Sequence, residues 1–105
     1  MRQPKPFIEF AESFLPNGCL FARLACNELP TARDGRRFSF TIQQIPEGEY
    51  AAGWFQCRSR ADGDGSLRYR TYRTLEEAEE VGRKWVTRKV MEVRRKRRLA
   101  ALANG

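Results

Sequence analysis

The alternation of hydrophobic and polar residues predicts several short strands in the first part of the chain. Residues 38–45 show it most regularly, because Phe38, Phe40 and Ile42 fall on one face and polar residues on the other, which is typical of a half-buried strand. Residues 50–61 and 66–74 have the composition of strands, and the turn sequences PEGE and DGDG separate the three segments. The pattern therefore predicts a meander of adjacent antiparallel strands.

The N-terminal residues 7–15 fit two structures. Their apolar side chains recur with the spacing of an amphipathic helix. The following Pro16-Asn17-Gly18 supplies an Asn-Gly turn, which would instead fold this segment back on residues 19–28 as a hairpin. We favour the hairpin and keep the helix as the alternative. Two favourable cross-strand pairs are expected in the hairpin register: Phe14 with Phe21, and Glu12 with Arg23.

The C-terminal part of the chain predicts one long helix. Thr74 is suited to be its N-cap, and Glu77 follows at the capping-box spacing. Apolar side chains form one broad stripe down to Val93, after which the sequence turns to RRKRR. We expect this stripe to cover one side of the sheet. Residues 94–105 are then either the basic end of the helix or a flexible tail.

These elements together predict one α+β domain over residues 1–105. Its sheet is an antiparallel β-meander of about four or five strands, and a long basic C-terminal helix packs on one face. The junction YRTLEEAEEVGRKW resembles the strand-to-helix junction of several small DNA-binding domains, including the arm-type domains of tyrosine recombinases. The likeness covers about a dozen residues that helix capping explains by itself, so we assign the chain to no family from it.

Charge is concentrated in one segment of the chain. Residues 83–98 hold nine of the 20 Lys and Arg residues and a single acidic residue, Glu92, so they carry +8 where the whole chain carries +7. Such asymmetry favours a polyanionic partner. We expect the basic run to contact phosphates without sequence preference. Its members are Arg94, Arg95, Lys96, Arg97 and Arg98.

A second candidate surface lies on the strands at 50–61 and 66–74. If Phe55, Cys57 and Ser59 point into the core, their neighbours point out. The same convention applied to the next strand sends Leu67, Tyr69 and Thr71 inward. The resulting outward face would pair guanidinium groups with phosphates and stack aromatic rings on bases. It comprises Trp54, Arg58, Arg60, Arg68, Arg70 and Tyr72.

The residue inventory argues against catalysis and against a metal. The sequence has no histidine, no Gly-rich phosphate loop and no carboxylate set spaced for two metals. The three cysteines lack C-x-x-C spacing, so we expect buried, reduced thiols. No apolar run is long enough to span a membrane, and Glu9 and Glu12 interrupt the N-terminal apolar stretch. We expect a cytoplasmic protein that needs no cofactor.

The sequence therefore favours a non-catalytic nucleic-acid-binding domain, with single-stranded DNA or RNA as the preferred ligand. The alternative is a small protein-interaction module, such as an inhibitor or adaptor, that docks its Trp and Arg residues on an acidic protein or a ribonucleoprotein. An exposed edge strand could also pair with a second copy, which would give a homodimer.

Overall fold

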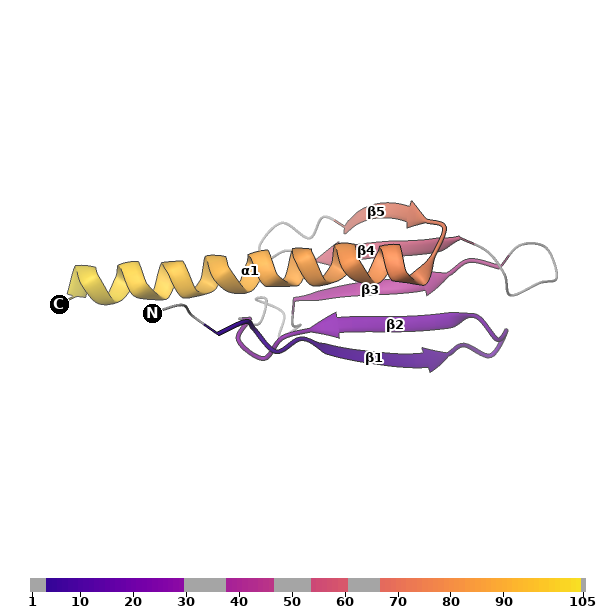
Figure 1. The fold of residues 1–105 in the computed structure, drawn as a ribbon, viewed down its shortest axis with the longest axis horizontal. Helices are drawn as coiled ribbons and strands as arrows, with labels where there is room; N and C mark the ends of the chain where they lie inside the picture. Colours follow the sequence, from indigo (N-terminus) through magenta and orange to yellow (C-terminus); the bar gives the residue numbers. More distant parts are fainter. Residues whose placement is uncertain (1–3, 30–37, 47–53, 61–66, 105) are drawn as a thin grey trace.

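The fold is a five-stranded antiparallel sheet with one long helix on one face (Figure 1). A computed structural model describes residues 4–29, 38–46, 54–60 and 67–104. The strand order follows the chain, β1-β2-β3-β4-β5, so the sheet is the predicted meander and the α+β class is confirmed. The strands are β1 (Glu9–Phe14), β2 (Leu20–Ala25), β3 (Ser39–Gln44), β4 (Phe55–Arg60) and β5 (Leu67–Tyr72).

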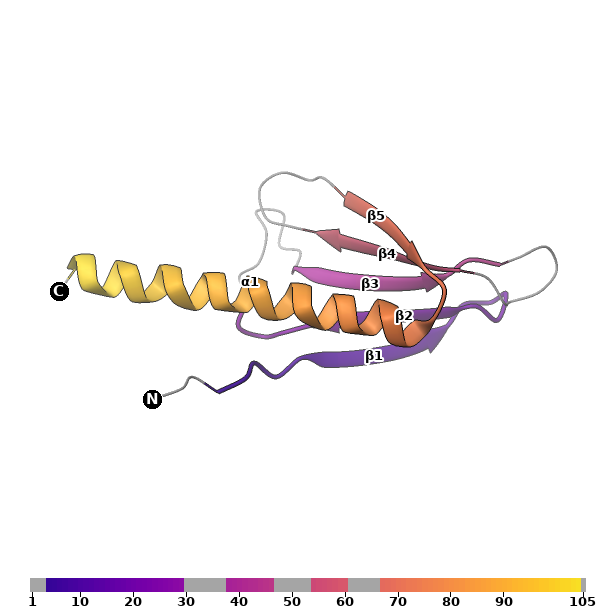
Figure 2. The same cartoon turned by 45° about the horizontal axis from the view of Figure 1, so that its top comes forward.

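Helix α1 (Leu75–Asn104) packs on the sheet with its axis roughly along the strands, and it continues well beyond the sheet (Figures 1 and 2). Thr74 caps its start, because the Thr74 hydroxyl accepts a hydrogen bond from the backbone N–H of Glu77 at 3.2 Å. The helix contacts β2, β3, β4 and β5. Its 30 residues correspond to about 45 Å of helix. Residues 94–104 are therefore helical and project past the end of the sheet, which gives the molecule its length of 60 Å.

The core lies between the helix and the inner face of the sheet. Leu24 of β2, Ile42 of β3 and Val86 and Val90 of the helix are fully buried. Trp85 packs against this core at its margin, where its ring lies 6.2 Å from that of Phe40. The alternation in residues 38–45 and the helical stripe thus identified both halves of the core.

The helix packs closely against the sheet at Gly82. A Cβ atom at this position would lie 2.5 Å from Cδ1 of Phe40 and 2.9 Å from Cδ1 of Leu24. Glycine normally costs a helix about 1 kcal/mol relative to alanine. Here the missing side chain lets two large core residues pack directly against the helix backbone.

The N-terminal hairpin is confirmed, but the predicted register is wrong by one residue. Phe14 pairs with Leu20, and Phe21 pairs with Ser13. The turn has three loop residues: Gly18 donates to the Leu15 carbonyl at 2.8 Å and adopts a φ of 85°, as in a type I turn followed by a glycine bulge. The added residue places Phe14 and Phe21 on opposite faces, and Phe14 stays exposed.

We predict that Gly82→Ala destabilises the protein although it raises helix propensity. Because the new methyl group would lie 2.5 Å from Cδ1 of Phe40, overpacking should cost an amount in the upper part of the usual range of about 1 to 3 kcal/mol, more than the gain of about 1 kcal/mol from replacing glycine. The melting temperature should therefore fall, whereas Arg88→Ala on the exposed side of the helix should leave it nearly unchanged.

A double variant identifies the cause of that loss. Combining Gly82→Ala with Phe40→Leu should cost less than the sum of the two single substitutions, because the smaller side chain makes room for the new methyl group. Additive losses, or a Gly82→Ala variant as stable as the wild type, would contradict the close packing.

Candidate nucleic-acid interface

The face of the sheet turned away from the helix carries two rows of mainly polar side chains. Residues directly opposite one another in neighbouring strands share a face, and these rows alternate with the buried Leu24, Phe40 and Cys57. No described helix or strand covers this side, which we call the open face (Figures 1 and 2). One row is Ala11, Arg23, Thr41 and Arg58; the other is Ser13, Phe21, Gln43, Gln56 and Thr71.

Trp54 and Arg73 extend the open face at one end. Trp54 accepts a backbone hydrogen bond from Ile45 at 2.8 Å, which continues the pairing of β3 with β4. Its side chain is 46% exposed, so it does not lie under the helix. The guanidinium carbon of Arg73 lies 4.9 Å from the centre of the Trp54 ring, a cation–π contact that holds both side chains in place.

The predicted face of four arginines does not form as expected. In the β4–β5 register, Cys57 pairs with Arg70 and Phe55 pairs with Tyr72. Since Cys57 is buried in the core, Arg70 and Tyr72 lie on the helix side of the sheet, and Arg58 lies on the open face. Arg70 is exposed because β5 is the edge strand, whereas Tyr72 is partly buried and packs against the core.

The cause of this error is the register between the two strands. Arg60 pairs with Leu67 across the six-residue connection, so inward-facing residues have odd numbers in β4 and even numbers in β5. The prediction carried the odd-numbered convention across the turn, and a shift of one residue reverses every side chain. The side chains of Arg60 and Arg68, which were also predicted to bind, lie outside the described residues.

Two cations of the open face were missing from the predicted set. Arg23 could have been found, because Leu20, Ala22 and Leu24 alternate with Phe21 and Arg23 in the manner of a half-buried strand. Arg73 follows β5 in the chain, and only the register reveals that it meets Trp54. Glu9, at the β1 edge, is the single acidic side chain that the described strands place on this face. The described part of the open face is therefore cationic.

The basic run divides into two groups. Arg94 makes a bidentate ion pair with the carboxylate of Glu28, with distances of 2.6 and 2.7 Å, and donates a further hydrogen bond to the Pro4 carbonyl at 2.8 Å. Only 16% of its side chain is exposed. Arg97 also donates to the Glu28 carbonyl, at 3.5 Å. Arg94 thus fastens the helix to the turn after β2 and to the N-terminal segment. Its contact with phosphates stays a prediction.

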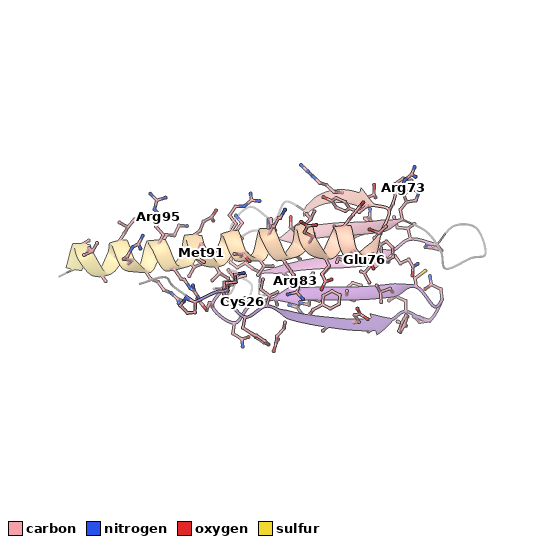
Figure 3. All side chains as sticks on the ribbon, viewed as in Figure 1. Cys26, Arg73, Glu76, Arg83, Met91 and Arg95 are labelled. Atoms are coloured by element: carbon pink, nitrogen blue, oxygen red, sulfur yellow. The ribbon has the colours of Figure 1, made fainter. Side chains whose placement is uncertain are left out.

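Arg95, Lys96 and Arg98 form the second group. All three are exposed, and no described residue pairs with them. Figure 3 shows Arg95 on the part of the helix beyond the sheet and Arg73 at the opposite end of the molecule. The structure therefore separates the open face from the free cations of the helix end.

The Arg94–Glu28 pair also affects protonation. The bidentate hydrogen bond from Arg94 lowers the pKa of the Glu28 carboxyl below its ordinary value of 4.5, against a smaller opposing effect of burial. The same hydrogen bond raises the pKa of Arg94. Both groups are therefore charged at neutral pH.

The described residues show no reactive thiol and no metal site. Cys19, Cys26 and Cys57 are free and buried, and burial raises the pKa of the Cys57 thiol to about 11, which keeps it protonated. The described residues contain no group of three or more His, Cys, Asp or Glu side chains placed to hold a metal ion. Among the helices described, none combines the length and apolar character that crossing a membrane requires.

Comparison with protein-family models, with curated proteins and with solved structures gave no match in any of the three searches.

We predict that Arg94→Ala lowers stability at neutral pH and reduces its dependence on pH. Because folding lowers the pKa of Glu28, the contribution of the ion pair is fully present above the ordinary pKa of 4.5 and is lost as pH falls through the folded-state value. The wild type and the exposed-neighbour control Arg95→Ala should both lose melting temperature between about pH 6 and pH 3. The Arg94→Ala variant should lose less over that interval.

A third variant separates charge from hydrogen bonding. Glu28→Gln keeps an acceptor for Arg94 but removes the titrating charge, so its stability should vary with pH as weakly as that of Arg94→Ala. If Arg94→Ala and Arg95→Ala have the same melting temperature at every pH, the ion pair contributes nothing to stability.

Proposed function

We propose that this protein is a non-catalytic binder of single-stranded DNA or RNA that uses the open face of its sheet. The observation that carries the proposal is a sheet face that no described helix or strand covers and that bears Arg23, Arg58 and the contacting pair Arg73 and Trp54. The sheet contributes one face to the core, and no described element places a second hydrophobic layer on the other.

The chemistry of this surface suits a nucleic-acid strand. Guanidinium groups make charge-assisted, often bidentate hydrogen bonds to phosphate oxygens. Trp54 offers a ring on which a base can stack, and stacking of this kind is worth about 1 to 3 kcal/mol per base. Its contact with Arg73 restrains the ring before binding, which lowers the entropy lost in the complex.

Side chains between the arginines add further hydrogen-bonding capacity. Thr41, Gln43 and Gln56 are half-buried in the middle of the sheet, where they can donate to and accept from bases or sugars. Phe21 is also half-buried there and adds an apolar ring. The cations of the helix end supply affinity that does not depend on sequence.

We predict that labelled single-stranded oligonucleotides bind with an affinity that falls linearly in log salt. The double variant Arg23→Gln/Arg58→Gln should bind more weakly and reduce the salt slope by about 1.4, since each phosphate contact on a single strand contributes about 0.7. Trp54→Ala should weaken binding by about 1 to 3 kcal/mol. Fluorescence anisotropy at several salt concentrations measures both effects.

Arg70→Gln is the matched control, because it removes an exposed arginine from the opposite side of the sheet. It should alter the affinity less than substitution of either open-face arginine. Equal losses for Arg70→Gln and Arg23→Gln would remove the open face from the proposal. Absence of binding even at low salt would contradict the proposed function and favour the alternative partner, an acidic protein.

A further inference from the structure

A second cationic surface lies on the outward side of helix α1. Arg88 is two residues from both Val86 and Val90, which are fully buried. Two residues correspond to about 200° of rotation, so Arg88 points away from the sheet. Arg95 is likewise two residues after the partly buried Val93, so it also points away from the buried side of the helix. Arg98 follows three residues later, one helical turn along. All three are exposed, and we call them the outer helix stripe.

Cations outnumber carboxylates on this surface, where Glu92 is one helical turn from both Arg88 and Arg95 and pairs with Lys89. The nearby Lys84 and Lys89 pair with Glu80 and Glu92. No described carboxylate pairs with Arg88, Arg95 or Arg98, and Lys96 next to them is also exposed without a partner. The stripe therefore has the charge of a phosphate-binding surface, and the exposed apolar side chains of Met91, Leu99 and Leu102 lie on the same side of the helix.

The stripe and the open face point in opposite directions. The shortest dimension of the molecule, 19 Å, runs along the view of Figure 1, in which the helix lies in front of the sheet. Arg23 and Arg58 lie on the face of the sheet turned away from the helix, and Arg88 lies on the side of the helix turned away from the sheet. The hydrophobic core separates the open face from Arg88, whereas Arg95 and Arg98 lie on the part of the helix that projects past the sheet. A stretch of nucleic acid that lies flat on the open face therefore does not reach Arg88.

We infer that the outer helix stripe binds a second segment of nucleic acid, so that one protomer bridges two strands. This inference rests on the proposed function of the open face. The open face holds one strand through arginines and a restrained tryptophan, and the stripe holds the phosphates of another through charge alone. Binding to the stripe should therefore be more sensitive to salt than to sequence.

The test compares two triple variants of equal net charge. One is Arg88→Gln/Arg95→Gln/Arg98→Gln, which removes the stripe, and the other is Arg23→Gln/Arg58→Gln/Arg73→Gln, which removes the open-face arginines. Glutamine keeps a long polar side chain, and melting temperatures confirm that both variants fold. Oligonucleotides of about ten nucleotides are used, a length in the range of single-strand site sizes. One is immobilised and a second carries a fluorophore.

We expect the wild type to bind two oligonucleotides per protomer and to retain the fluorescent strand on the immobilised one. Each triple variant should bind one oligonucleotide per protomer, and retention of the second strand should fall at least about tenfold, because three phosphate contacts are lost in each case. Light scattering gives the number of protomers, which distinguishes bridging by one chain from bridging by a dimer.

Other results separate the two proposals. If the wild type binds one strand per protomer and both triple variants weaken that same binding, the bridging inference is wrong and the proposed function stands. Retention of the second strand by the stripe variant also overturns bridging through the stripe. If the wild type binds no oligonucleotide at all, the proposed function fails and the bridging inference fails with it.

Discussion

The architecture depends on the contact between helix α1 and one face of the sheet at Gly82. Without a side chain at this position, Phe40 and Leu24 reach the helix backbone, and Val86 and Val90 become fully buried further along. In the described part of the chain, one helix packs against five strands, and it covers one side of the sheet. The other side must then remain soluble by its own composition, which explains why Thr, Gln, Ser and Arg side chains alternate with core residues along the central strands.

The strand registers decide which side each arginine occupies. Alternation within a strand is visible in the sequence, but it leaves open which of the two faces is buried whenever both contain apolar and charged residues. This was the case in β5, where Tyr72 shares a face with Arg70. The pairing of Cys57 with Arg70 resolves the ambiguity, since Cys57 is buried. Turn geometry had the same effect in the N-terminal hairpin, where the bulge at Gly18 shifted Phe14 away from Phe21.

The parts of the fold that could be predicted are those specified by local physics. Thr74 predicts the start of the helix because its hydroxyl caps the first turn, and the repeat of Phe38, Phe40 and Ile42 identifies a half-buried strand. The candidate surface could be predicted only in part. Arg58 and the exposure of Trp54 were anticipated, but the contact of Arg73 with Trp54 and the ion pair of Arg94 with Glu28 join residues that are far apart in the chain. Such contacts follow from tertiary packing, and the spacing of residues along the sequence does not predict them.

The ion pair at Arg94 also determines how the basic run can be used. By binding Glu28 and the Pro4 carbonyl, Arg94 fixes the rotation of the helix about its own axis just where the helix leaves the sheet. A helix fixed in rotation presents its remaining cations in defined directions: Arg97 also reaches Glu28, Arg95 points away from it, and Arg98, four residues after Arg94, lies between these directions. Five consecutive cations thus act as two separate sets. One set completes the fold, and the other is exposed on the part of the helix beyond the sheet.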